Sequence, residues 1–220
     1  MDFDIKKWLD DISEKIKAQF KNRILFIGYQ GSYQRGEATP DSDIDMVVIL
    51  DKLNFEDLKE YKKIIKSMSY CEKACGFVSG KSEITNWSKS DMFQFIYDTK
   101  SLYGNINEII TPMDETDIKN AVKTSAETLY HSACHSFLYD NDLKQSLCIL
   151  YKMTFFILQA DYFLQNNKYL PTKKDLFEQL KGEDKEILET CINKDLITNF
   201  TEQEIEVLYK RLIKWCSKKI

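Results

Sequence analysis

The sequence predicts an α+β protein in which a small mixed β-sheet domain, residues 1–112, precedes an all-helical bundle domain, residues 113–220. Short apolar runs bounded by Gly, Asp and Lys, which are typical of strands, occur only before residue 105. Beyond residue 114 the apolar residues recur at helical spacing instead. A chain of 220 residues with 43 % hydrophobic residues is long enough to pack both domains.

The elements of the first domain follow from local patterns. Apolar residues at helical spacing between Ile5 and Phe20 predict an opening helix. Asn54 is a plausible N-cap for a second helix, and a third is expected over residues 91–97. Residues 31–42 are expected to form a loop. The strands are predicted over residues 23–28, 43–50, 75–79 and 100–104.

In the second domain we expect five helices. Two long ones are marked by apolar residues around 129–137 and 147–162, and shorter ones begin near Thr172, Glu183 and Thr201. The most apolar stretch, residues 147–164, is interrupted by polar residues that include Asp161, so it predicts a buried helix and not a membrane span. If Asp161 is buried it needs a partner, which could be a lysine or an acceptor amine.

Composition excludes several functions. The net charge of −4 lacks the basic character of proteins that bind long nucleic acids, and no membrane span is expected. The six cysteines are scattered, and the charged N-terminus does not resemble a secretory signal. We therefore expect a cytoplasmic protein with reduced cysteines, and the sequence leaves a monomer and a homodimer open.

Residues 31–50, GSYQRGEATPDSDIDMVVIL, carry most of the chemical information. Asp43 and Asp45 are two apart at the start of a strand, so their side chains should share one face. Carboxylates that converge repel unless a cation lies between them, and this predicts one or two Mg²⁺ ions. Gly31 and Ser32 offer backbone N–H groups and a hydroxyl to a phosphate, and Arg35 could pair with a phosphate oxygen. The reaction class that follows is nucleotidyl transfer.

The run G-S-x10-D-x-D resembles the active-site signature of the polymerase-beta-like nucleotidyltransferase superfamily, especially its bacterial aminoglycoside and minimal nucleotidyltransferases. The resemblance implies that Gly31 and Ser32 contact the nucleotide phosphates and that Asp43 and Asp45 bind metal. Residues 167–173, NKYLPTK, are similar to a stretch of streptomycin-type adenylyltransferases. That likeness implies that Lys173 meets the triphosphate, although one residue is inserted between proline and lysine.

One position departs from the family pattern. The family usually has a third carboxylate on the next strand, but residues 74–79 contain no Asp or Glu. Glu83, Asp98 and Glu72 are candidates for this group. Alternatively, the general base comes from the helical domain, or metal alone activates the acceptor. For Arg35 a surface ion pair with Glu37 is the alternative reading, and for Lys173 a surface position.

The resemblance implies Mg²⁺-dependent transfer of a nucleoside monophosphate, AMP from ATP, to a hydroxyl of a small molecule such as an aminoglycoside-like antibiotic. We expect the acceptor to bind in a cleft between the two domains. Two alternatives stay open. One is AMPylation of a protein hydroxyl, as in toxin–antitoxin nucleotidyltransferases. The other is a nucleotide-binding module without turnover, because the third acid is missing.

Overall fold

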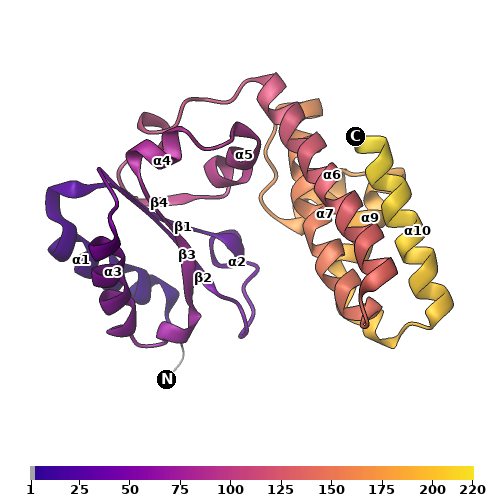
Figure 1. The fold of residues 1–220 in the computed structure, drawn as a ribbon, viewed down its shortest axis with the longest axis horizontal. Helices are drawn as coiled ribbons and strands as arrows, with labels where there is room; N and C mark the ends of the chain where they lie inside the picture. The colour runs from indigo at the N-terminus through magenta and orange to yellow at the C-terminus, as the bar shows by residue number, and fades with distance from the viewer. Residues whose placement is uncertain (1–2) are drawn as a thin grey trace. The chain divides into compact units, whose positions relative to one another are not determined.

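A four-stranded mixed sheet organises the first half of the chain in the computed structural model, which describes residues 3–220 (Figure 1). The strand order is β3-β2-β1-β4. Strand β1 pairs antiparallel with β2 and β4, whereas β2 and β3 run parallel. The predicted α+β class with a mixed sheet is therefore confirmed. The strands are β1 (Ile24–Gln30), β2 (Ile44–Leu50), β3 (Ala74–Gly80) and β4 (Lys100–Tyr103).

One face of the sheet packs against the helices α1 (Ile5–Phe20) and α3 (Phe55–Lys66), as Figure 1 shows, and the opposite face is also buried at Val47 and Ile49. Alternate residues of β2, from Ile44 to Leu50, belong to this buried core. Because side chains alternate along a strand, Asp45 points to the opposite face. Helix α2 (Gly31–Arg35) follows β1, and α4 (Lys81–Thr85) follows β3. Helix α5 (Lys89–Tyr97) precedes β4, and all three helices are short.

Strand register defines two ends of the sheet, which we name by residues of β2. At the Asp45 end, Gln30 of β1 and Cys75 of β3 are the partners of Asp45. At the Leu50 end, Ile24 and Gly80 are the partners of Leu50. Asp45 and Leu50 are five positions apart on β2, which is about 17 Å at the usual rise of a strand.

The second half of the chain is helical, as the sequence predicts. The caps that begin its helices include a capping box at Asp114 and another at Thr201, and the Thr172 hydroxyl accepts from the Asp175 amide. The helices are α6 (Glu115–Tyr139), α7 (Leu143–Asn166), α8 (Lys173–Gln179), α9 (Gly182–Ile192) and α10 (Glu202–Lys219), with a 3₁₀ segment over Lys194–Asn199.

Helix α7 is long and apolar enough to cross a membrane by length and composition. Half of its most apolar window is buried inside the protein, against α6, α9 and α10. Its buried residues include Tyr151, Phe155 and Asp161. Burial of this kind is what the core helix of a helical bundle requires, which agrees with the prediction of a buried helix.

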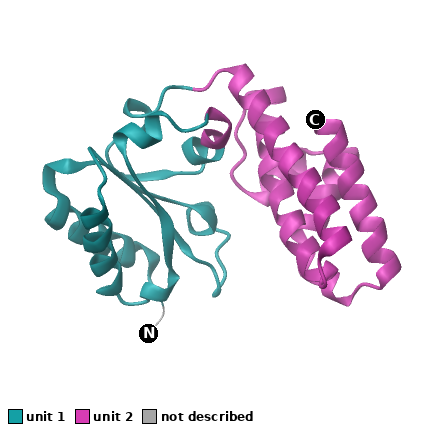
Figure 2. Ribbon diagram, viewed as in Figure 1, with its two compact units in different colours: residues 1–88, 94–112 teal, residues 89–93, 113–220 magenta. Residues whose placement is uncertain are grey.

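The chain forms two units (Figure 2). Unit 1 comprises residues 1–88 and 94–112, and unit 2 comprises residues 89–93 and 113–220. The sequence predicts one boundary, between residues 112 and 113, so the placement of residues 89–93 differs from that division. The reason is side-chain packing, because the Phe93 ring lies 5.4 Å from the Phe163 ring and Lys89 pairs with Asp117 at 2.8 Å.

Candidate functional site

The backbone of Gly31 lies directly against the Asp45 carboxylate. Gly31 has a φ of +77°, and a Cβ built on it would come within 2.1 Å of Asp45 Oδ2. The approach follows from the fold, since Gly31 continues from Gln30, the antiparallel partner of Asp45. Only glycine combines this backbone conformation with the space that the carboxylate occupies. The structure therefore brings together two residues that the sequence predicts to share a site.

The predicted loop over residues 31–42 begins as a short helix. Helix α2 spans Gly31–Arg35 and ends at Gly36, which has a φ of +71° and donates to the carbonyls of Ser32 and Tyr33. The amide of Glu37 also donates to the Ser32 carbonyl, at 2.9 Å. The hydrophobic spacing of such a short segment is uninformative, which is why the sequence predicts only a loop. Ser32 lies in the first turn and is half-buried.

Asp43 is exposed and immediately precedes β2, two residues before Asp45. The segment that leads to Asp43 forms a turn, in which the Ser42 amide donates to the Thr39 carbonyl at 3.0 Å. The Lys73 ammonium contacts the carbonyl of Pro40 and lies 3.5 Å from that of Ser42. Lys73 comes just before β3, so the parallel pairing of β2 and β3 places it beside this turn.

Arg35 lies in a buried ionic cluster with Asp98 and Glu37. Its guanidinium pairs with Asp98 Oδ2, and its Nε lies 3.2 Å from Glu37 Oε2. The pairing of Arg35 with Glu37 that the sequence offered as an alternative is therefore formed, but it does not lie at the surface, because the side chains of Arg35 and Asp98 are each only 7 % exposed. Asp98 Oδ2 also accepts from the Gly31 amide at 3.2 Å. The structure thus gives Arg35 protein carboxylates as partners, and its predicted contact with phosphate stays a prediction.

The carboxylates of Asp45 and Asp98 lie near each other because both contact Gly31. The N and Cβ positions of one residue are about 2.5 Å apart, so the two contacting oxygens are separated by at most about 8 Å. Among the described residues, no three His, Cys, Asp or Glu side chains form a group that could hold a metal. Mg²⁺ is commonly bound by one or two carboxylates plus substrate phosphates, so Asp43 and Asp45 suit that ion.

The three candidates for a third carboxylate have different positions. Glu83 lies at the Leu50 end, because a Cβ on Gly80 would come within 2.3 Å of its Oε2. Glu72 is exposed in the segment before β3. Asp98 alone of the three contacts Gly31 by a described bond. At the position of β3 paired with Asp45 stands Cys75, which is exposed.

Lys173, the lysine predicted to meet a triphosphate, is the first residue of α8 in unit 2. It is half-buried, and its ammonium lies 4.9 Å from the centre of the Phe155 ring. Gly31 and Asp45 belong to unit 1. A role of Lys173 in nucleotide binding therefore stays a prediction from resemblance.

Sequence reasoning missed the bonding of Lys73 and the way Asp98 is used. The signal for Lys73 was weak, because a lysine before a strand is ordinary. Its meaning depends on the parallel pairing of β2 and β3, which residue spacing does not reveal. Asp98 was only one of several acids after the third strand, and its bond to Gly31 spans 67 positions of the chain.

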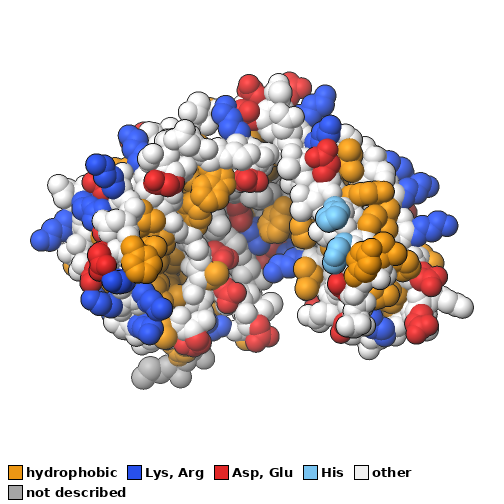
Figure 3. Space-filling model, in the orientation of Figure 1, with side chains coloured by type: hydrophobic (Ala, Val, Ile, Leu, Met, Phe, Trp, Pro, Cys, Tyr) orange, Lys and Arg blue, Asp and Glu red, His pale blue; other side chains and the backbone are white. Residues whose placement is uncertain are grey.

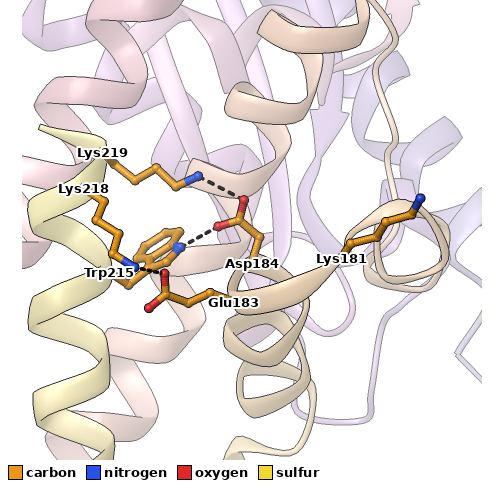
Figure 4. Close-up of a pocket in the computed structure, with 6 residues that line it drawn as sticks. All are labelled: Lys181, Glu183, Asp184, Trp215, Lys218 and Lys219. Atoms are coloured by element: carbon orange, nitrogen blue, oxygen red, sulfur yellow. Dashed lines mark hydrogen bonds and ion pairs between the residues drawn. The ribbon is translucent and has the colours of Figure 1, made fainter.

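Unit 2 has a pocket lined by charged side chains of α9 and α10 (Figure 4). The Lys219 ammonium lies 2.6 Å from Asp161 and 3.1 Å from Asp184, and the Trp215 indole N–H also donates to Asp184. Burial opposes the charge of Lys219, but these bonds outweigh it and raise the pKa of the ammonium. Asp161 thus has the lysine partner that the sequence offered as the structural alternative.

The two histidines of the chain lie one turn apart on α6, with ring centres 6.1 Å apart. Figure 3 shows them side by side next to exposed hydrophobic side chains of unit 2. His135 also stands 5.0 Å from the Tyr139 ring, which makes this an aromatic surface cluster. The pair is not part of a three-ligand metal group within residues 3–220.

Comparison with known proteins gives consistent results. The nucleotidyltransferase domain family matches residues 9–97. A stretch of 73 residues is 37 % identical to a "Putative protein adenylyltransferase" of Methanocaldococcus jannaschii, covering 33 % of this chain and 68 % of that protein. The alignment with that relative spans two thirds of its length at an identity well above chance similarity.

Solved structures also resemble this chain. The crystal structure of spectinomycin adenyltransferase from Enterococcus faecialis with ATP and spectinomycin aligns over 95 % of this chain and 99 % of that chain. The TM-score is 0.56 and the identity is 16 %, so this likeness shows a shared fold. A toxin–antitoxin structure with AMP-PNP aligns over 60 % of this chain at a TM-score of 0.34 and 20 % identity, which is too low to indicate a shared fold.

Proposed function

This chain belongs to the nucleotidyltransferase family, and from that premise we propose that it transfers AMP from ATP to a hydroxyl group of a small molecule. The observation that carries the proposal is the placement of Gly31 against the Asp45 carboxylate. This placement supports the proposal because nucleotidyl transfer requires backbone that can bind phosphate beside a side chain that can bind metal. ATP as the donor is supported by the adenylyl groups in the names of the two similar proteins.

Each residue of the site has a role in this proposal. Ser32 donates its N–H group and hydroxyl to the triphosphate, and Gly31 lets the backbone approach the phosphates closely while Asp98 holds the Gly31 amide. Asp43 and Asp45 would hold Mg²⁺. The ion, when bound, neutralises phosphate charge and lowers the pKa of the attacking hydroxyl. The acceptor oxygen forms a bond to the α-phosphorus while the bond from that phosphorus to the bridging oxygen breaks. Pyrophosphate leaves, and the hydroxyl proton passes to a base or to solvent.

We propose an aminoglycoside-like acceptor for two reasons. The fold of the whole chain, including the helical unit, is similar to that of an enzyme crystallised with ATP and spectinomycin. A protein of net charge −4 also attracts a polycationic acceptor. The acceptor hydroxyl has to be identified by experiment, because proteins that share a fold can act on different substrates.

A protein hydroxyl is the second candidate acceptor. It is favoured by the name of the archaeal relative, which describes a protein adenylyltransferase. A nucleotide-binding module without turnover is the third candidate, motivated by Cys75 at the strand position paired with Asp45, where an acid would complete the site. The three candidates differ in where a label from the nucleotide should appear.

The test uses purified full-length protein with each α-³²P-labelled NTP and Mg²⁺. Parallel reactions contain a panel of aminoglycosides and spectinomycin, a cell lysate, or no acceptor. We expect label from ATP on a small molecule, and no transfer when EDTA removes the metal. Label on a protein band instead would replace the first candidate with the second. Tight ATP binding without product in any reaction would favour the third.

A further inference from the structure

The junction between α5 and β4 contacts the proposed nucleotide site through two consecutive residues. Asp98 accepts from the Gly31 amide at 3.2 Å, and the Thr99 hydroxyl donates to Gln30 Oε1 at 2.9 Å. Gln30 is in turn the strand partner of Asp45. A segment far along the chain is therefore bonded to the residues that immediately precede and begin α2.

Asp98 holds both ends of α2 through a single oxygen. Its Oδ2 contacts the amide of Gly31, the first residue of that helix, and the guanidinium of Arg35, the last. Both charged side chains are 7 % exposed, so the pair is shielded from water and from salt. The Arg35 Nε–H donates to Glu37 Oε2 at 3.2 Å, so a second carboxylate holds another edge of the guanidinium.

The backbone of Gly31 has little space in which to move. Its backbone stands so close to Asp45 that even a methyl group would overlap the carboxylate. A small displacement of α2 would therefore change both the position of the phosphate-binding backbone and the space around Asp45. Displacements of about 1 Å in a reacting site can cost a hundredfold in rate. A fixed support for α2 is thus useful to the site.

We propose that Asp98 is a positioning residue for nucleotide binding. It acts through Arg35 and Gly31, by holding α2 at the distance from Asp45 that a metal-bound triphosphate needs. The proposal rests on the proposed function, because it assumes that this turn receives a nucleotide. It assigns Asp98 neither to metal binding nor to proton transfer, since the oxygen described here already has two donors.

The test measures the Kd of ATP with Mg²⁺ by calorimetry on the full-length chain, together with the melting temperature. Asp98→Asn keeps an oxygen acceptor but removes the charge that Arg35 requires. We expect its Kd to rise about tenfold, and Arg35→Gln to have a similar effect. The double variant should bind about as weakly as each single variant, because the two residues act as one support.

Asp57→Asn is the matched control. Asp57 is a buried aspartate of unit 1 that also pairs with an arginine, the partly exposed Arg23, but at the Leu50 end of the sheet. This variant should lower the melting temperature and leave the Kd for ATP within twofold of wild type. A general loss of stability would lower the melting temperature of the control and of the test variants alike. If Asp98 positions α2, only the variants at the Asp45 end should also raise the Kd for ATP.

The outcomes are separable from those of the proposed function. If the wild-type chain does not bind ATP with Mg²⁺, the proposed function itself fails. If wild type binds and Asp98→Asn binds within twofold of it, the role of Asp98 is overturned. Recovery of the Asp98→Asn Kd at 20 mM Mg²⁺ would make Asp98 a metal ligand and also overturn it. Should Asp98→Asn not fold, Arg35→Lys, which keeps the charge but loses the fork, must weaken ATP binding at least threefold.

Discussion

An arginine–aspartate pair stands at each end of the sheet. At the Leu50 end, Arg23 lies 2.7 Å from Asp57, and Asp57 also completes the capping box that begins α3. At the Asp45 end, Arg35 pairs with Asp98, and Asp98 binds the backbone of Gly31. The first pair ties the 3₁₀ turn Lys21–Arg23, which precedes β1, to the first turn of α3. The second ties a helix turn to the residue that touches Asp45.

The two ends differ in their balance of charge. Arg23 at the Leu50 end donates to both Asp51 and Asp57, and Asp51 is half exposed to water. At the Asp45 end the carboxylates of Asp98 and Glu37 lie around one guanidinium, and the carboxylate of Asp45, two residues after Asp43, stands against Gly31. Concentrated negative charge needs a cation for stability. The same pair of residue types therefore supports a helix cap at one end and the proposed nucleotide site at the other.

Asp45→Asn should give the largest contrast between the ends. The amide keeps the size of the side chain but weakens metal binding, so we expect nucleotidyl transfer to fall about a thousandfold or more. The matched control is Asp51→Asn, in which an exposed aspartate just beyond the other end of β2 is changed in the same way. Initial rates with the acceptor found by labelling check both variants. Near-normal transfer by Asp45→Asn would remove the distinction between the ends.

Gly31→Ala should have the next largest effect. The new methyl group combines a φ of +77° with a position 2.1 Å from Asp45 Oδ2, so we expect about a hundredfold loss of transfer. Strain at such a backbone position also costs about 1 to 2 kcal/mol of stability. Rates and urea denaturation check the two effects separately.

Gly36→Ala is the control for backbone strain alone. Gly36 has a φ of +71°, but a Cβ there meets nothing within 4 Å. The two alanine variants should therefore lose similar stability, while only Gly31→Ala loses most of its activity. Equal losses of activity would mean that the shape of α2 matters and its contact with Asp45 does not.

The sequence predicts the Asp45 end well where the evidence is local. The glycine–serine pair, the two aspartates two apart and the strands around them all depend on spacing that strand geometry makes interpretable. The sequence does not predict the contacts of Asp98, because they join residues 67 positions apart and depend on how α5 returns to the sheet. The same limit left Glu83 as a candidate, since an acid near the end of β3 looks close to the site until strand register is known.

Asp57→Asn should affect stability and its dependence on pH, but not transfer. The hydrogen bond from Arg23 is the main cause that holds the pKa of Asp57 below its ordinary value of 3.8, against the opposing effect of burial. A lowered pKa contributes stability that is present above pH 3.8 and is lost as the pH falls through the folded value. We expect the variant to lose about 1 to 2 kcal/mol at pH 7, because a charge-assisted bond is removed.

The difference between wild type and Asp57→Asn should shrink as the pH falls below 3.8, because Asp57 of the unfolded chain then takes up a proton while the lowered pKa keeps it ionised in the folded protein. Urea denaturation at pH 7, 5 and 3 measures this difference. A gap that stays constant down to pH 3 would mean that the loss comes from the helix cap and not from the ion pair. Transfer at pH 7 should be within twofold of wild type in either case.

Glu83→Gln should have the smallest effect of these substitutions. The Glu83 carboxylate lies against Gly80, which is the strand partner of Leu50. It is therefore about 17 Å from Asp45 along the strand direction. A general base must be within hydrogen-bond reach of the proton it removes, directly or through one water. We therefore expect kcat and KM within twofold of wild type, with an unchanged pH profile of kcat. A loss of a hundredfold, or of the acidic limb of that profile, would place catalysis at the Leu50 end, and the roles assigned here to the two ends of the sheet would have to be exchanged.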